Sequence, residues 1–176
     1  MTRTDVPSGA PDAPTGPSGT RALREPAARH ALLPLRIFLG VTFVYAGLDK
    51  LTDSAFLSAT GSGSIGELMA GVRDTSAIPA MVDLALKAPV GFAVALAIGE
   101  LLVGLGVLAG LLTRIASVGG ALISLSLWLT VSWAVTPYYY GNDLIYLMAW
   151  TPLVLAGAPY LSLDSLIRSR RSRRTA

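Results

Sequence analysis

Glu100 is the residue whose position in the sequence most strongly suggests chemistry, because it lies inside a long apolar run between Pro89 and Leu112. It comes about 11 residues into this run, or roughly 16 Å along a helix that rises 1.5 Å per residue. A carboxylate so deep in hydrocarbon must pair with a cation, face water or take up a proton. Two interpretations stay open: a site that exchanges protons, and a protonated side chain that joins two helices by a hydrogen bond.

The preceding apolar run supplies two basic residues that could accompany this carboxylate. Arg36 and Lys50 share one helical face with Gly40, Phe43 and Gly47, at alternating spacings of four and three residues. Glycines allow a neighbouring backbone to approach closely, so we expect this face to point into a bundle. The alternative is that both cations extend separately to lipid headgroups.

A third group of candidate residues precedes the last apolar run. The aromatic segment 133–140 is typical of a membrane interface, and Asn142 and Asp143 follow it. The simplest interpretation of Asn142 and Asp143 is a helix N-cap. The alternative is that they border, together with the charged residues of the first two runs, a polar pocket open toward the outer side.

The elements that must position these residues follow from composition. Of the 176 residues, 52 % are hydrophobic and only 14 % are charged, whereas soluble domains carry about a quarter charged residues. This excludes a water-soluble enzyme. Each of four apolar runs is close to the ~20 residues that a membrane span needs: about 32–51, 89–112, 115–135 and 143–160. We therefore predict an all-α polytopic membrane protein with a bundle of four transmembrane helices.

The remaining segments complete the predicted organisation. Residues 1–30 are interpreted as a disordered tail, 31–164 as the membrane domain and 165–176 as a basic tail that contacts anionic lipid. The outer loop, 52–88, is expected to hold one or two short interfacial helices. All Lys and Arg except Lys50, Arg73 and Lys87 fall on one side, which predicts cytoplasmic N- and C-termini in a bacterial plasma membrane.

Small residues on the second and third runs predict where helices pack. Gly106 and Gly110 form a G-x-x-x-G pattern, and Arg114 between these runs is first a positive-inside anchor. The third run carries a stripe of small and polar side chains, made of Ser117, Gly120, Ala121, Ser124, Trp128 and Ser132. In the fourth run Pro152 is expected to kink the helix.

Several cofactors are excluded by residues that the chain lacks. There is no cysteine, and the one histidine is His30 beside the predicted tail. These absences rule out thiolate metal sites, iron–sulfur clusters and a bis-histidine haem within the bundle. No glycine loop of the nucleotide-binding kind is present either. We therefore expect no metal, haem or flavin, and no nucleic-acid partner.

Taken as a set, these motifs resemble the DoxX/DoxD-like family of small bacterial membrane proteins. The resemblance is carried by RIFLGVTFVYAGLDKL at 36–51, SAFL at 54–57, GELLVGLGVLAGLLTRIAS at 99–117, YYYGNDLIYLMAWTPLVLAGA at 138–158 and LSLD at 161–164. It implies a four-helix membrane bundle. Its DoxD branch is associated with thiosulfate:quinone oxidoreductase, in which a DoxD-type subunit acts together with a second subunit.

The resemblance leads to a first functional hypothesis, a membrane subunit of a quinone-linked oxidoreductase. Glu100, Lys50 and Asp143 would be catalytic, and quinone contacts would come from Arg36, Arg114, Asn142 and Tyr140. A second oxidoreductase subunit, membrane lipids and further copies of the chain are the expected partners. Two alternatives stay open: a non-enzymatic scaffold for redox or stress-response proteins, and a small transporter or proton pathway around Glu100.

Overall fold

The structure, a computed structural model, describes residues 30–157. The two predicted tails and the end of the fourth apolar run fall mostly on residues 1–29 and 158–176, outside the described residues. Within the described part the fold is all-helical, as predicted. The long helices are α2 (Leu33–Thr52), α5 (Pro89–Ala109), α6 (Thr113–Leu127) and α7 (Asn142–Ala156), and the short ones are α3 (Ile65–Val72) and α4 (Pro79–Leu86).

Three short turns connect or extend these helices. A π-helical turn, Trp128–Ser132, extends α6 at its C-terminal end. Single 3₁₀ turns lie at Arg73–Thr75, after α3, and at Tyr138–Tyr140, before α7. The one or two short helices predicted for the outer loop are therefore α3 and α4. Ser64 caps α3, since its Oγ accepts a hydrogen bond from the Glu67 amide.

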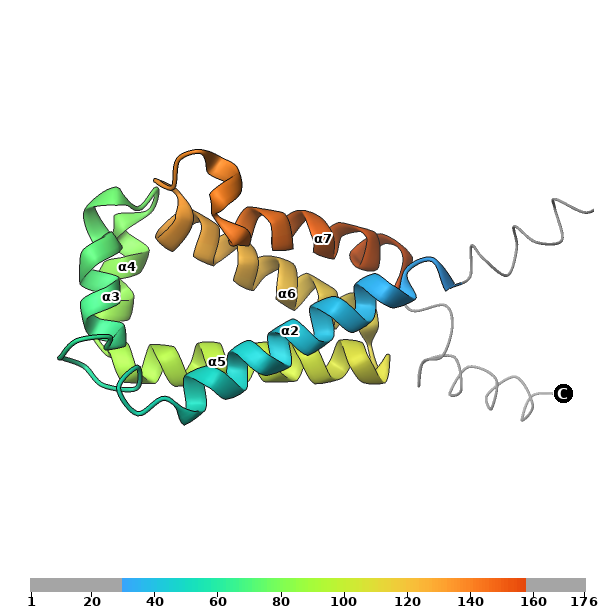
Figure 1. Ribbon diagram of the computed structural model, residues 1–176, viewed down its shortest axis with the longest axis horizontal. Helices are drawn as coiled ribbons and strands as arrows, with labels where there is room; N and C mark the ends of the chain where they lie inside the picture. The colour runs from blue at the N-terminus through green and yellow to red at the C-terminus, as the bar shows by residue number, and fades with distance from the viewer. Residues whose placement is uncertain (1–29, 158–176) are drawn as a thin grey trace, which may run out of the picture.

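The long helices form two pairs, α2 with α5 and α6 with α7, as Figure 1 shows. Helices α3 and α4 lie across one end of both pairs, and we call the segment Ile65–Leu86 the cross-piece. We call the end of the bundle that carries the cross-piece the outer end, after the orientation predicted from the sequence. The start of α2 and the end of α7 both lie at the opposite, inner end.

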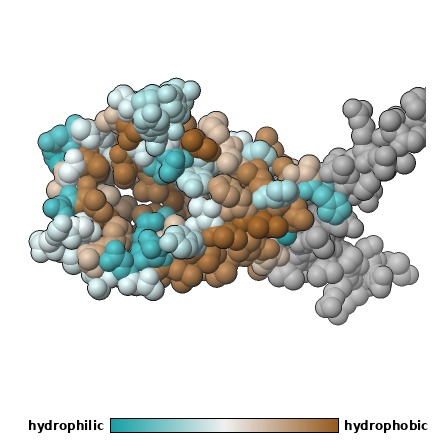
Figure 2. Space-filling model, viewed as in Figure 1, coloured by the Kyte–Doolittle hydropathy of each residue, from teal (hydrophilic) through white to brown (hydrophobic). Residues whose placement is uncertain are grey.

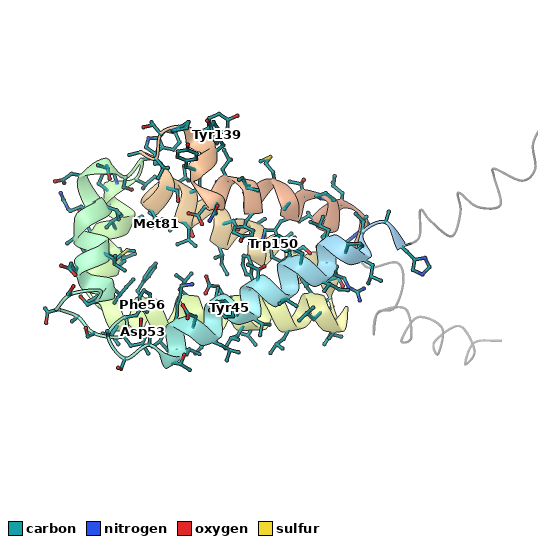
Figure 3. All side chains as sticks on the ribbon, in the orientation of Figure 1. Tyr45, Asp53, Phe56, Met81, Tyr139 and Trp150 are labelled. Carbon is teal, nitrogen blue, oxygen red and sulfur yellow. The ribbon has the colours of Figure 1, made fainter. Side chains whose placement is uncertain are left out.

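The bundle core is centred on Trp150, which is fully buried. Its ring packs edge-on against Phe43 with centroids 4.9 Å apart, and Leu39, Val103, Val107 and Leu153 complete the cluster. In Figure 3 Trp150 lies among the long helices, far from Tyr139 at the connection between α6 and α7. The buried members come from α2, α5 and α7, and Ala116, Ala121 and Ile123 of α6 pack against them, so this core joins all four long helices.

One glycine of the predicted G-x-x-x-G pattern does not act as the sequence suggested. Gly110 has φ +68° and follows the last residue of α5, so it ends the helix instead of packing in a G-x-x-x-G pair with Gly106. Leu112 then adopts φ +49° at the turn into α6. In α7, Pro152 lies inside the helix, which continues to Ala156.

Two of the helical segments are long and apolar enough to cross a membrane: Pro89–Ala109 and Thr113–Ser132, which joins α6 to its π turn. Helix α2 has 20 residues but includes Arg36, Asp49 and Lys50. Helix α7 has 15 residues, or roughly 22 Å of helix, against about 30 Å of hydrocarbon.

Candidate functional site

The seam between α2 and α5 is built on glycines that let the two backbones touch. A Cβ added at Gly47 would come within 2.6 Å of the Ala97 carbonyl oxygen, and one added at Gly104 within 2.8 Å of the Gly40 carbonyl oxygen. These contacts pair the start of one helix with the end of the other, so the helices are antiparallel. The predicted inward face of α2 is confirmed, because Arg36, Gly40, Phe43 and Gly47 are buried.

At the outer half of this seam Lys50 and Glu100 form an ion pair. Lys50 Nζ lies 2.8 Å from Glu100 Oε2 and 3.0 Å from Oε1, and 3.4 Å from the carbonyl oxygen of Ala46. The Glu100 side chain is only 5 % exposed and that of Lys50 is 23 % exposed. The lysine therefore directs its ammonium group into the bundle, toward the Glu100 carboxylate.

The antiparallel arrangement explains why these two side chains meet. A helical side chain leans toward the N-terminus of its own helix. Lys50 thus leans inward along α2, while Glu100 leans outward along α5. The glycine contacts place Lys50 about one turn outward from Glu100, and the long lysine stem covers that interval. Apolar runs alone do not indicate this pair. The face that Lys50 shares with Gly40 and Gly47 made it one of two candidate partners of Glu100.

A second carboxylate, Asp143, lies at the outer end of α7. It accepts a hydrogen bond from Ser132 Oγ and is close enough to Lys50 and Glu100 to interact with both electrostatically. The N-cap interpretation was wrong: Gly141 is the N-cap residue and no side chain caps α7. The carboxylate of Asp143 is directed to α6 instead.

Ser132 is the contact that the sequence did not single out. It was predicted only as the last member of a packing stripe on the third run. The stripe itself is confirmed at its centre, since Ser117, Gly120 and Ser124 are buried and the Trp150 ring lies where a Gly120 side chain would be. No sequence signal marks the π turn that carries Ser132.

The four residues predicted to contact a cofactor are spread over the molecule. Asn142 is exposed beside Asp143, and Tyr140 is 68 % exposed and packs edge-on against Tyr139. Arg36 is buried at the inner half of α2, 14 residues before Lys50 and hence roughly 21 Å from it along the helix.

Arg114 belongs to the inner end as well, near the C-terminus of α7. Its Nη2 donates to the Leu155 carbonyl oxygen at 2.7 Å, which places a cation at the last turn of that helix, where carbonyl groups lack helical partners. The structure therefore brings Lys50, Glu100 and Asp143 together and leaves Arg36 and Arg114 apart from them.

The molecule is hollowed on the face that Figure 2 shows. Figure 2 shows an opening through the molecule between the cross-piece and the two helix pairs, with hydrophilic and hydrophobic residues both at its rim. The view is taken with the long axis of the molecule horizontal, so the opening faces the side of the bundle and not its outer end.

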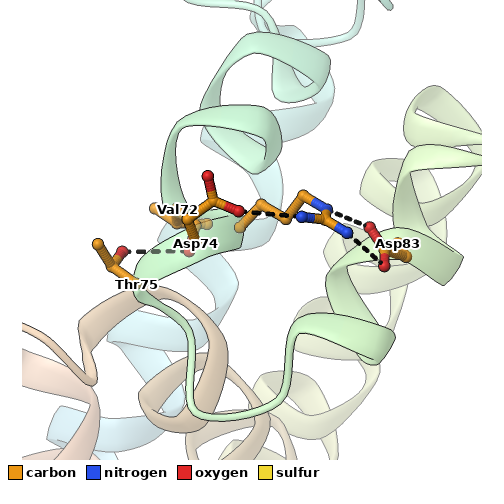
Figure 4. Close-up of polar contacts among 5 residues, drawn as sticks. Val72, Asp74, Thr75 and Asp83 are labelled. Carbon is orange, nitrogen blue, oxygen red and sulfur yellow. Dashed lines mark hydrogen bonds and ion pairs between the residues drawn. The ribbon is translucent and has the colours of Figure 1, made fainter.

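A separate ion cluster lies within the cross-piece, as Figure 4 shows. Arg73 Nε donates to Asp83 Oδ1 at 2.5 Å and Nη2 to Oδ2 at 3.0 Å, while Nη1 donates to Asp74 at 2.9 Å. The Arg73 guanidinium holds the pKa of Asp83 below its usual range, chiefly through these hydrogen bonds, and the two carboxylates raise the pKa of Arg73. This cluster joins α3 to α4 through exposed charges.

Fold and site together define a class: an all-helical protein with two helices able to cross a membrane and a lysine–glutamate pair buried between helices. The sequence profile of the DoxX family matches residues 31–133. This is more than half of the chain, which therefore belongs to the DoxX family. The match includes Lys50 and Glu100 and ends before Asp143. No curated protein and no solved structure gives a significant match to the chain.

Proposed function

We propose that α2, α5, α6 with its π turn, and α7 all cross the membrane. Helices α2 and α7 support this because both expose apolar side chains that a water-soluble protein rarely leaves uncovered. On α2 these include Phe38, at 54 % exposed, and Val41, at 53 %; on α7 they include Met148, at 55 %, and Leu155, at 75 %. The short α7 requires local thinning of the bilayer, which costs little per ångström of mismatch.

In this proposal the cross-piece faces the outer compartment, and both termini lie in the cytoplasm. The inner end of the bundle carries Arg36 and Arg114, and most other basic residues of the chain lie in the two terminal segments. The bias of Lys and Arg toward one side of the membrane supports this orientation.

The proposed activity is that of a membrane subunit of a quinone-linked oxidoreductase, in which the Lys50–Glu100 pair binds the quinone headgroup. The buried ion pair is the observation that carries this proposal. Removing two charges from water costs several kcal/mol per ion, and hydrophobic replacements are often no less stable. Ionisable residues at membrane depth accordingly mark sites for substrates or protons.

The chemistry of the residues fits a quinone. Reduction of a quinone places negative charge on its oxygen atoms and consumes protons, with the electrons supplied here by a second subunit. The Lys50 ammonium can donate hydrogen bonds to a carbonyl oxygen and stabilise that charge. The Glu100 carboxyl can exchange a proton at the same place, with Asp143 as a nearby second carboxyl.

The side opening suits a ligand that is dissolved in lipid. A molecule with a polar head and an apolar tail could enter between the helix pairs and leave its tail in the bilayer. Asn142 and Tyr140 are at the outer rim of such a route, whereas Arg36 and Arg114 are too distant to contact the headgroup. A scaffold without a ligand could join α2 to α5 by apolar side chains, which are often no less stable than a buried ion pair.

Binding of a short-chain quinone analogue to the protein in lipid nanodiscs tests this function. We expect Lys50→Ala and Glu100→Gln each to weaken binding about tenfold or more, which corresponds to the loss of one charge-assisted hydrogen bond of about 1.4 kcal/mol. Gly99→Ala is the matched control, because a Cβ there meets only the Ile123 side chain, at 3.5 Å. Equal affinities in all four proteins would exclude the pair as the binding site.

A further inference from the structure

The cross-piece lies between the Lys50–Glu100 pair and the outer end of the molecule. Its inner surface forms a second core, in which Ile65, Met69 and Val82 pack over Ala93 of α5. Ala93 is 0 % exposed. The opening in Figure 2 faces sideways. The cross-piece covers the outer end of the space between the helix pairs where it packs on α5.

The cross-piece is held together as one unit by the two-point contact between Arg73 and Asp83 (Figure 4). A guanidinium and a carboxylate joined by two parallel hydrogen bonds fix the orientation of the elements that carry them. Since Arg73 follows α3 directly and Asp83 lies within α4, the contact makes the two short helices move together.

One carbonyl group attaches this unit to the helix pair on the other side. The Leu129 carbonyl oxygen accepts a hydrogen bond from the Ala77 amide at 2.9 Å and another from Ser76 Oγ at 3.2 Å. Leu129 belongs to the π turn, where the regular helical hydrogen-bond pattern is interrupted. The same turn carries Ser132, which donates to Asp143. The turn therefore contacts the cross-piece and a carboxyl group of the site at once.

The connections at both ends of the cross-piece are short segments of irregular backbone. Before α3 lie Gly61, with φ +104°, and Gly63, with φ +79°, and a side chain at either glycine would meet nothing within 4 Å. After α4, Ala88 has the irregular φ of −149° and ψ of 66° that separates α4 from α5. Hinges in proteins are short loop segments of this kind that absorb changes in φ and ψ.

We propose that the cross-piece is a hinged gate that controls contact between outer water and the Lys50–Glu100 pair, with the π turn as its latch. Opening breaks the bonds to the Leu129 carbonyl, admits water from the outer end and loosens the turn that holds Asp143. The gate would supply the protons that a quinone site needs. The role of the gate in proton supply therefore rests on the proposed function. The movement of the cross-piece can be measured without any quinone.

The test uses the absence of cysteine from the sequence. A single cysteine in place of Ala93 is the only thiol, and a polar maleimide in nanodiscs reaches it only when the cross-piece lifts. We expect slow labelling of Ala93→Cys, compared with Ser62→Cys in the exposed loop. Adding Ser76→Ala removes the bond to Leu129 and also the one that Ser76 Oγ accepts from the Ile78 amide within the cross-piece. Loss of the bond to Leu129 alone should speed labelling about fivefold.

Asp74 supplies the matched control for the Arg73 contact. Asp74→Ala removes a carboxylate that binds Arg73 from the adjacent position, without touching the link to α4. Arg73→Ala should therefore speed labelling of the cysteine at position 93, and Asp74→Ala should not. Equal rates in all variants, or no labelling at position 93 in any of them, would show a fixed cap and overturn the gate.

Amide hydrogen exchange gives a second readout that needs no cysteine. The Ala77 amide should exchange faster in Ser76→Ala than in the parent protein, while the amides of the central turns of α5 are unchanged. If exchange at Ala77 is as slow as in α5 in both proteins, the latch does not open. Loss of quinone binding in the earlier experiment would leave both of these results interpretable, because neither involves a ligand.

Discussion

The two helix pairs of this protein are joined in different ways. Along the α2–α5 seam backbone touches backbone at Gly47 and Gly104, and the polar contact at the outer half is an ion pair between Lys50 and Glu100. Along the α6–α7 seam an aromatic ring occupies the space above a glycine. Its outer polar contact joins one carboxylate to a neutral hydroxyl.

Under the proposed function, this difference separates a site from a support. The α2–α5 seam brings a cation and a carboxylate together between helices, a costly arrangement that often marks a site for a ligand or a proton. The α6–α7 seam gains its stability from the Trp150 core and contributes a single acidic group, Asp143. Variants that remove equivalent contacts from each seam should therefore differ in size of effect.

The largest effect is expected for Lys50→Met, which leaves the Glu100 carboxyl buried without its cation. Removing one partner of a buried ion pair typically costs 3–5 kcal/mol, and the partial exposure of Lys50 places the expected loss at about 3 kcal/mol. Thermal unfolding in nanodiscs measures it. The double variant Lys50→Met with Glu100→Leu should recover much of the loss. A double variant as unstable as the single one would contradict the coupling.

A smaller loss, about 2 kcal/mol, is expected for Gly47→Ala, because its Cβ would meet the Ala97 carbonyl oxygen, which cannot move aside. Gly99→Ala in α5 is the control. Its Cβ would meet only the Ile123 side chain, at 3.5 Å, and alanine favours a helix by up to ~1 kcal/mol. Unfolding measurements should show a near-neutral Gly99→Ala; a loss equal to that of Gly47→Ala would argue against backbone contact along the seam.

On the other seam Ser132→Ala removes the hydroxyl that binds Asp143, for an expected cost of about 1 kcal/mol. Ser126→Ala serves as its reference, since the Ser126 hydroxyl bonds only to the Ile123 carbonyl within the same helix. The comparison of the seams predicts that Ser132→Ala costs clearly less than Lys50→Met. The same unfolding assay measures all of these variants. A larger loss of unfolding free energy for Ser132→Ala than for Lys50→Met would contradict the distinction between the two seams.

The smallest effect concerns pH and the exposed Arg73–Asp83 contact. Because Arg73 lowers the pKa of Asp83, the contact contributes its full stability above the usual aspartate range and loses it as pH falls through the lowered pKa. The raised pKa of Arg73 keeps the arginine charged throughout. The effect of this contact on the exchange rates of the α3 and α4 amides should therefore be constant between pH 5 and 8. Asp83→Asn should raise them across that whole interval.

The sequence predicted the helices well because their signals are local. Apolar runs, the serine before α3 and the proline at the start of α4 and of α5 each act over a few residues. The inward face of α2 was also predictable, since Gly40, Phe43 and Gly47 recur at helical spacing. Helix ends were predicted less accurately. The apolar run continues to residue 112, but Gly110 adopts a left-handed conformation and ends α5 at Ala109.

The site was predicted only in part, because its second half depends on contacts between distant segments. Lys50 and Glu100 were identified as unusual charges, and their antiparallel helices bring them together. The bond between Ser132 and Asp143 needs the π turn, which no residue pattern announces. The hydrogen bonds from Ser76 and Ala77 to the Leu129 carbonyl oxygen likewise join segments more than 50 residues apart in sequence.

The most direct test of the account is photolabelling with a photoreactive quinone analogue in nanodiscs, followed by mapping of the modified residues. The account predicts label on the outer half of α2 and on α5 around Glu100, displaced by unlabelled quinone and absent in Glu100→Gln. Label confined to α6 and α7, or spread over lipid-facing residues such as Leu102 and unaffected by competitor, would contradict it.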